Sequence, residues 1–197
     1  MSDLIPTQFA QPALSAEQTR MLDWLFSNRP NVFLTGRAGT GKTTLLREFM
    51  RRAGNKAVVL APTGVAAMHV GGQTLHSFFR LPPRLIEPRD IKRLRNARVV
   101  KAMETLVIDE ISMVRADMLW AIDACLRLNR DRNEPFGGVQ VVLVGDLAQL
   151  PPIVQNEEAA YLEMSYGGPF FFNPPVFRDA GFSLMELEHV YRQSDPE

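Results

Sequence analysis

Residues 31–44 constrain this chain more than any other stretch. They read NVFLTGRAGTGKTT, which combines an apolar run typical of a buried strand, a turn with three glycines and the beginning of a helix. Gly36, Gly39 and Gly41 allow a tight turn, so that several backbone N–H groups can converge on one anion at the helix N-terminus. The match to the pattern G-x-x-x-x-G-K-[ST] is complete, which makes a chance glycine-rich turn the weaker interpretation.

This loop predicts a site for phosphate groups and for Mg2+. Lys42 supplies a mobile positive charge, and the Thr43 hydroxyl is placed to bind the magnesium ion that bridges the outer phosphates. The remaining predicted nucleotide contacts come from the loop and the first turn of the helix: Gly36, Ala38, Gly39, Thr40, Gly41 and Thr44.

Four further runs read as strands: 56–61, 105–109, 139–144 and 182–187. The first three are largely apolar, as expected for parallel strands that are covered on both faces. Amphipathic helical patterns, such as 114–129, lie between them. The sequence therefore predicts an α/β fold with a mostly parallel sheet flanked by helices.

Composition allows one good core and gives no general case for a nucleic-acid partner. The chain has 197 residues, 46% of them hydrophobic, and its 22 basic residues cancel its 22 acidic ones. The charges are unevenly placed, because residues 80–101 hold eight basic and two acidic side chains. A solvated face and a binding surface both remain open for this stretch. Its prolines, within 81–98, predict a surface excursion that contributes little to the core.

The single cysteine and the absence of long apolar runs point to an intracellular protein without a membrane partner. Cys125 lies in an apolar helical pattern and is expected to fill the core. No run approaches the roughly 20 apolar residues of a membrane span. Residues 1–14 lack any period, and we expect an arm that orders only against the body.

Two runs that follow the predicted β-strand 56–61 have the composition of a surface that binds single-stranded nucleic acid. APTGVAA at 61–67 and GGQTLHSFF at 71–79 offer small residues, bare backbone and hydroxyls close to aromatic rings. Single-stranded nucleic acid is held by such contacts to phosphates and bases. The alternative is that the apolar residues of these runs pack a short helix on the sheet. Thr63, Thr74 and His76 have no evident packing reason, which favours the binding interpretation for them.

Asp109 and Glu110 are adjacent acids at the C-terminal end of a buried strand. Two carboxylates there would be costly without a partner. A magnesium ion and an activated water provide one, with Asp109 toward the metal and Glu110 polarising the water that attacks the last phosphate. An isolated Asp-Glu pair is weak evidence, but this one follows a phosphate loop and a strand.

Polar side chains also follow the two later strands. GDLAQLPPI comes directly after 139–144, and its Asp146 and Gln149 should point at the phosphate end of the same cleft. Gln149 can sense the terminal phosphate by hydrogen bonding. Arg192 follows the strand 182–187 and is placed to contact that phosphate as charge develops. A surface ion pair is the alternative for Arg192.

Four motifs in this order, GRAGTGKT, VIDEISM, GDLAQLPPI and VYRQ, resemble those of superfamily 1B DNA helicases. The runs APTGVAA and GGQTLHSFF narrow the resemblance to the Pif-type helicases, and it covers residues 18–193. It implies a RecA-like P-loop NTPase core, ATP with magnesium, and 5′-to-3′ translocation on single-stranded DNA. It also implies unwinding of duplexes, forks or G-quadruplexes, with roles in DNA repair, DNA recombination and telomere maintenance.

The resemblance assigns roles residue by residue. Gln18 resembles a glutamine that recognises adenine, although it also completes an S-x-x-Q capping box with Ser15, so both roles stay open. Gln149 resembles the terminal-phosphate sensor, and Arg192 the first of two arginines around that phosphate. Six residues match the DNA-contacting runs: Pro62, Thr63, Gly64, Thr74, His76 and Ser77.

The resemblance also predicts the domain organisation. Residues 15–197 correspond to the first RecA-like motor domain, and 80–101 fall where relatives insert a small subdomain that helps to split the duplex. The second RecA-like domain is absent from this chain, so we expect weak activity or none from the chain alone. The expected protein is monomeric, and it is cytoplasmic in a bacterium or nuclear or mitochondrial in a eukaryote.

Two other interpretations remain. One is another superfamily 1B motor, of the RecD or phage Dda type. The other is an interaction module that binds nucleotide without moving on DNA.

Overall fold

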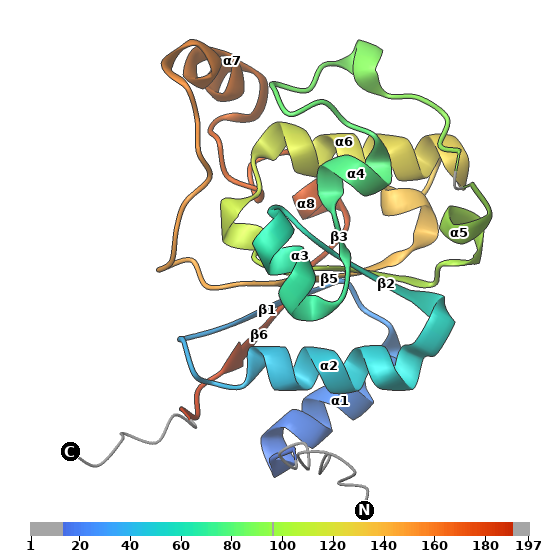
Figure 1. The fold of residues 1–197 in the computed structure, drawn as a ribbon, viewed down its shortest axis with the longest axis vertical. Coiled ribbons are helices and arrows are strands. Elements are labelled where there is room, and N and C mark those ends of the chain that lie inside the picture. The colour runs from blue at the N-terminus through green and yellow to red at the C-terminus, as the bar shows by residue number, and fades with distance from the viewer. Residues whose placement is uncertain (1–13, 96, 191–197) are drawn as a thin grey trace, which may run out of the picture.

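The computed structural model describes residues 14–95 and 97–190. A six-stranded sheet runs through their centre in the order β3-β2-β4-β5-β1-β6, and every pair of neighbouring strands is parallel (Figure 1). The strands are β1 Val32–Gly36, β2 Ala57–Ala61, β3 Gln73–Thr74, β4 Thr105–Ile108, β5 Gln140–Val144 and β6 Ser183–Leu187. The predicted α/β class with a parallel sheet is confirmed.

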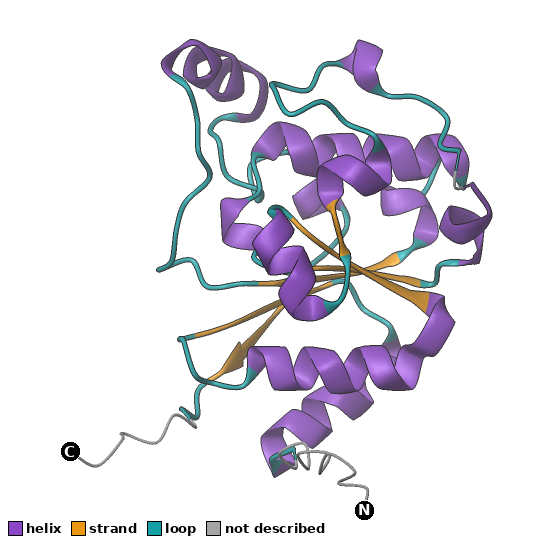
Figure 2. Cartoon of the chain, viewed as in Figure 1, coloured by secondary structure: helices purple, strands orange, loops and turns teal. Residues whose placement is uncertain are grey.

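Helices cover both faces of the sheet (Figure 2). On one face lie α1 Ala16–Asn28 and α2 Lys42–Ala53. On the other lie α4 Leu75–Phe79, α5 Ala97–Ala102, α6 Ala116–Asn129 and α8 Pro175–Asp179. Two more helices are α3 Gly64–Val70 and the projecting α7 Asn156–Tyr166, and the 3₁₀ turns are η1 Gly54–Lys56, η2 Pro88–Asp90, η3 Ile111–Met113 and η4 Pro135–Gly138. None of the helices described is both long enough and apolar enough to traverse a bilayer.

The pleat of the strands divides the buried side chains between two cores. In β5, Val141 and Leu143 join the larger core beneath α6, whereas Val142 and Val144 join the core beneath α1 and α2. This alternation is expected because successive side chains of a strand point to opposite faces. Cys125 fills the larger core as predicted, and burial raises the pKa of its thiol to about 12.

The basic segment 80–101 lies on the surface, but the expectation that it contributes little to the core is wrong. Leu81, Ile86 and Leu94 are buried in the larger core. Side chains of α6 hold the backbone in place, because Asp117 Oδ2 accepts a hydrogen bond from the Ile86 N–H at 2.9 Å. The Asn129 Oδ1 accepts another from the Leu94 N–H at 3.1 Å.

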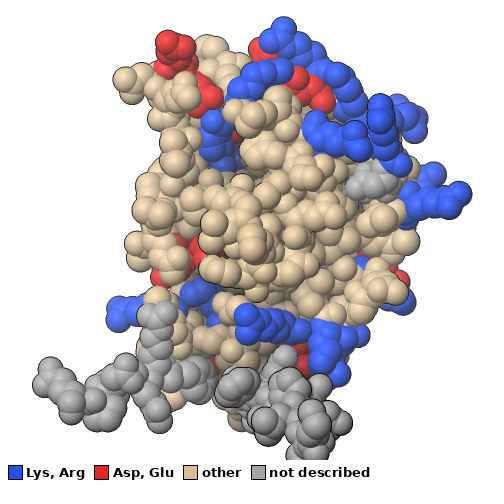
Figure 3. Space-filling view, in the orientation of Figure 1, with Lys and Arg blue, Asp and Glu red and all other residues tan. Residues whose placement is uncertain are grey.

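The basic side chains of this segment remain on the outside. Figure 3 shows Lys and Arg gathered along the side of the molecule that the segment forms in Figure 1. Two of the arginines are paired locally, Arg84 with Asp90 and Arg89 with Glu87. The anchors on α6 therefore present a cationic surface in a defined position.

Asp117→Ala should lower the free energy of unfolding by about 3 kcal/mol. Asp117 is fully buried and also binds Arg115 through both carboxylate oxygens, so the change leaves a half-buried guanidinium and the Ile86 N–H without this partner. Urea unfolding followed by circular dichroism measures the effect. Asp179→Ala removes an exposed pair with Arg178 and should cost less than about 1 kcal/mol. Equal losses in the two variants would contradict the anchoring role.

Candidate nucleotide and nucleic-acid site

The glycine-rich loop is shaped by close contact with β6. Gly36 ends β1, and a Cβ atom there would lie 2.7 Å from the Leu187 carbonyl oxygen and 2.8 Å from Thr40 Oγ1. Thr40 is buried, and its hydroxyl donates to the Arg37 carbonyl at 2.9 Å. Gly41 has a φ of 85°, in the left-handed region that glycine adopts readily. The sequence pattern therefore corresponds to steric requirements of the loop.

The N-terminus of α2 is open to an anion. Gly41 caps the helix without a side-chain hydrogen bond, and the first turn contains no acidic residue. The first helical bond runs from the Leu45 N–H to the Gly41 carbonyl at 3.0 Å. The N–H groups of the three residues before Leu45 have no intrahelical acceptor, and the helix dipole favours negative charge beside them. Thr43 is exposed at this end and Thr44 is partly exposed.

Lys42 is folded back onto its own loop. Its ammonium group donates to the carbonyl of Gly36 and, at 3.1 Å, to the carbonyl of Arg37. Both acceptors are neutral and belong to the loop itself. A phosphate oxygen at the α2 N-terminus is a stronger, charged acceptor for the same ammonium group.

Asp109 and Glu110 follow β4, which is separated from β1 by β5 alone. Burial raises the pKa of the Asp109 carboxyl, and the charge of Glu110 raises this pKa further. The positive charges of Lys42 and His69 act in the opposite direction. Because β1, β5 and β4 are parallel, Asp109 and the loop that carries Lys42 emerge at the same edge of the sheet.

Glu110 has an unusual backbone conformation that the sequence did not reveal. Its φ of 52° and ψ of 44° lie in the left-handed region, and η3 begins at the next residue. Such a conformation costs a residue other than glycine about 1 kcal/mol or more and is common at functional sites. Gly145 makes room for the turn, because a Cβ there would lie 2.8 Å from Ile111 Cγ2. The sharp turn thus fixes the position of the Glu110 Cα and the direction in which its side chain leaves the backbone.

One cavity brings Glu110 and Gln149 together with Thr63. Gln149 is exposed, and Asp146 holds it in a turn by accepting a hydrogen bond from Gln149 Nε2 at 3.3 Å. Glu110 and Gln149, both predicted to be catalytic, therefore share a cavity with Thr63 of the run 61–67, which is predicted to bind single-stranded nucleic acid.

The same cavity contains two residues that the sequence analysis missed, His69 and Ser112. Ser112 is buried, and its hydroxyl has no hydrogen-bond partner among the described residues. Its place two residues after Glu110 was the available signal. His69 lies on the helix that begins after Thr63, and nothing in its spacing pointed to the acids.

Gln18 is 3% exposed and makes the predicted capping box with Ser15. Its Oε1 accepts from the Ser15 N–H at 3.0 Å, and its Nε2 donates to the Gly41 carbonyl at 3.4 Å. Both ends of the amide thus bind the protein, one in the helix cap and one at the phosphate loop. The capping role is confirmed, whereas the contact with adenine stays a prediction.

Thr63 and Thr74 have structural roles, so the expectation that they lack one is wrong. The Thr63 hydroxyl accepts from the Ala66 N–H at 3.2 Å and caps α3. The Thr74 hydroxyl accepts from the Ser77 N–H at 3.2 Å and caps α4. Both hydroxyls keep their own proton for another acceptor.

The other candidates differ in exposure. Gly64 and Ser77 are exposed, while Pro62 and His76 are partly exposed. All lie in or directly after the connections that leave β2 and β3 at the carboxyl edge of the sheet. Arg192 lies outside the described residues.

The fold and this arrangement match one family. The family model for PIF1-like helicases matches residues 13–181. This chain belongs to the PIF1-like helicase family.

Individual PIF1-like helicases agree with this assignment. The chain is 39% identical over 190 residues to the ATP-dependent DNA helicase Pif1 of Bdellovibrio bacteriovorus, with 92% of this chain and 40% of that protein covered. It is 35% identical to human ATP-dependent DNA helicase PIF1, covering 94% of this chain and 28% of the relative. Bacteroides Pif1 solved with ADP-AlF3 and single-stranded DNA is 43% identical, with a TM-score of 0.87 over 94% of this chain and 44% of that one. The chain thus spans less than half the length of these relatives.

Asp109→Asn should raise the thermal unfolding midpoint by a few degrees at pH 7 without magnesium or nucleotide. The folded-state pKa of Asp109 is raised above its ordinary value of 3.8, so its charged form destabilises the fold at neutral pH. As the pH falls from above that raised pKa to 3.8, wild-type Asp109 becomes neutral and the advantage of the variant should disappear.

Thermal scans between pH 7 and pH 3.5 test this prediction. Glu163→Gln removes an exposed carboxylate of α7 and should leave the midpoint nearly unchanged throughout. A destabilised Asp109→Asn variant at pH 7 would show that burial is not the dominant influence on Asp109.

Proposed function

We propose that this chain is the first RecA-like motor domain of a 5′-to-3′ ATP-dependent DNA helicase. The observation that carries the proposal is the cavity that joins Glu110 and Gln149 to Thr63. A motor needs its hydrolytic residues coupled to its track-binding residues, because nucleotide state must change the affinity for DNA, and a shared cavity provides a direct route for this coupling. The family relatives are named ATP-dependent DNA helicases, which supports the same conclusion.

The phosphates of ATP would bind the open N–H groups at the α2 N-terminus, together with the backbone of Gly36, Ala38, Gly39, Thr40 and Gly41. Lys42 would exchange its two loop carbonyls for phosphate oxygens. Thr43 and Thr44 follow in the first helical turn. A Bacteroides relative was solved with ADP-AlF4, which supports nucleotide binding by this chain.

The chain's own residues fit a magnesium ion. Thr43 and Asp109 offer oxygen ligands, and the ion typically takes one or two protein ligands and completes its shell with phosphates and water. The buried Asp109 carboxyl, with its raised pKa, is a group that a divalent cation would stabilise in its charged form. When bound, the ion would neutralise charge on the outer phosphates.

Hydrolysis requires a base, a sensor and cationic stabilisation. Glu110 would take the proton of the attacking water. Its backbone is in the left-handed conformation, and the residue lines the cavity. Gln149 would report on the terminal phosphate through the turn it shares with Asp146. Arg192 remains a predicted contact to that phosphate.

Single-stranded DNA would run along the carboxyl edge of the sheet. Thr63 and Thr74 would donate their hydroxyl protons to phosphates while capping α3 and α4. Pro62, Gly64, His76 and Ser77 would complete the surface. Bacteroides Pif1 has been solved with single-stranded DNA, and another Pif1 structure describes DNA unwinding at forked duplex DNA, which supports these partners.

The finer features are part of the same proposal. They comprise forked and G-quadruplex substrates, a monomeric state, an intracellular location, an inserted subdomain around 80–101 and a second RecA-like domain in the whole protein. The cationic surface anchored on α6 supports contact between 80–101 and a nucleic-acid backbone.

Lys42→Ala should abolish the thermal stabilisation that nucleotide gives the chain. For wild type, nucleotide at 100 times its dissociation constant should stabilise the fold by about 2.7 kcal/mol. Thermal scans with and without ATP and magnesium measure the difference. Lys101→Ala, at an exposed position of α5, serves as the control and should keep the full shift. A full shift in Lys42→Ala would exclude the loop as the phosphate site.

Glu110→Gln should keep nucleotide and DNA binding in the full-length protein while lowering the ATPase rate at least about 100-fold, because the amide cannot accept a proton.

The function itself is tested by unwinding assays on duplexes with 5′ or 3′ single-stranded tails. Wild type should open the 5′-tailed substrate only, and Glu110→Gln neither. Unwinding from the 3′ tail would overturn the proposed direction, and persistent hydrolysis would assign the base to another residue.

A further inference from the structure

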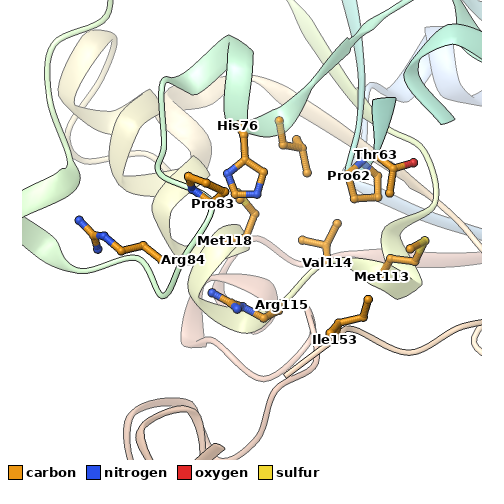
Figure 4. A pocket seen from close by; sticks show the side chains of 11 residues that line it. Pro62, Thr63, His76, Pro83, Arg84, Met113, Val114, Arg115, Met118 and Ile153 are labelled. Carbon is orange, nitrogen blue, oxygen red and sulfur yellow. The ribbon is translucent and has the colours of Figure 1, made fainter. Parts of the chain in front are cut away.

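A second cavity lies beside the predicted DNA track, separate from Asp109, Glu110 and the phosphate loop. It is formed by α4, the segment after α4, the start of α6 and the segment after β5. Figure 4 shows the side chains that line it: Pro62, Thr63, Leu75, His76, Pro83, Arg84, Met113, Val114, Arg115, Met118 and Ile153. Three of these, Pro62, Thr63 and His76, belong to the proposed strand-binding surface. A strand held there would pass the mouth of the cavity.

The cavity combines apolar walls with a flat ring. Val114 and Met118 are buried in the larger core and form apolar parts of the wall. The His76 ring projects into the space, as Figure 4 shows. Pro62 and Pro83 add the apolar faces of their own rings. The His76 ring between apolar walls suits a planar heterocycle.

His76 also offers a defined hydrogen-bonding group. Its Nδ1 lies 3.3 Å from the Leu81 carbonyl oxygen, which can only accept. Nδ1 therefore carries the proton in the neutral ring, and Nε2 is left as an acceptor. The exocyclic amino groups of adenine, cytosine and guanine are donors that match it.

The carboxylates near the cavity are held in ion pairs. Arg84 binds both carboxylate oxygens of Asp90, at 2.7 and 2.9 Å. Arg115 binds Asp117 through Nε and Nη2 and binds Glu158 through Nη1. These bonds use three of the five N–H donors of Arg115, so its guanidinium can still donate to a base carbonyl. Each of these three carboxylates is thus paired with an arginine, which reduces its repulsion of a polyanion.

We propose that this cavity takes one unstacked base of the single strand. The base would stack on the His76 ring, place its apolar faces against the methionines and prolines, and present its polar edge to His76 Nε2 and Arg115. This proposal rests on the proposed function, because the strand must first lie on the carboxyl edge. It adds a register point at which the protein grips a base rather than the backbone.

The test uses abasic substitution in DNA bound by the full-length protein. The shortest oligonucleotide that binds with full affinity is made as a series, each member lacking one base, so that the register cannot slide. Fluorescence anisotropy measures the affinities. For wild type, one position should weaken binding at least about fivefold, in line with the worth of one stacked base, while its neighbours change little.

Two variants should remove this sensitivity at that position. His76→Leu keeps apolar bulk but loses the ring face and the acceptor. Ile153→Trp fills the cavity from an 80% exposed position, where the fold should tolerate it. Met164→Ala changes another exposed apolar residue, on α7, and should retain the wild-type pattern.

The outcomes separate this proposal from the proposed function. Equal losses at every position in wild type, or an unchanged pattern in both variants, would overturn the base site while leaving the motor intact. Failure of the protein to bind intact single-stranded DNA would overturn both. If a side chain from another part of the full-length protein fills the cavity instead, wild type should show equal losses at every position, which would overturn the base site.

Discussion

The parallel pairing of β1 with β5 and of β5 with β4 is the constraint on which the rest of the structure depends. Because all these strands run the same way, the loop after β1 and the acids after β4 emerge at one edge. Hydrogen bonds continue just past the strand ends, since the Gly145 N–H donates to the Leu34 carbonyl of β1 and the Asp109 N–H donates to the Leu60 carbonyl of β2. The influence of the Lys42 charge on the pKa of Asp109 agrees with this register, and a slip of one residue would turn each side chain to the opposite face.

Features encoded locally were predictable from the sequence. The phosphate loop was found because its glycines meet steric needs within a few residues, and the acids because a buried strand precedes them. The anchoring of 80–101 was not predictable, since it depends on Asp117 and Asn129, which lie 31 and 35 residues from the backbone they bind. The left-handed turn at Glu110 was also hidden, because no glycine or asparagine marks it.

The two threonine caps were only partly predictable from the sequence. Thr63 and Thr74 each precede a helix and accept a bond from an N–H three residues later, which is an N-cap pattern visible in sequence. The helices α3 and α4 have only seven and five residues, so their apolar periodicity was too short to mark them. Capping does not exclude a second role, because a hydroxyl that accepts one bond still donates its proton. The same side chains can thus fix two short helices and orient their donors toward a phosphate backbone.

Under the proposed function, coupling between nucleotide and DNA requires no long pathway. One cavity is lined by Glu110, Gln149 and Thr63, so a movement of any one of these residues alters the surroundings of the other two. The buried Ser112 hydroxyl adds to this, because a polar group without a partner is unfavourable and gains most from a new acceptor or donor in the cavity. Under the proposed function, a ligand that moves the α3 cap changes the environment of Glu110 and Gln149, and by linkage nucleotide changes the affinity for DNA by the same factor.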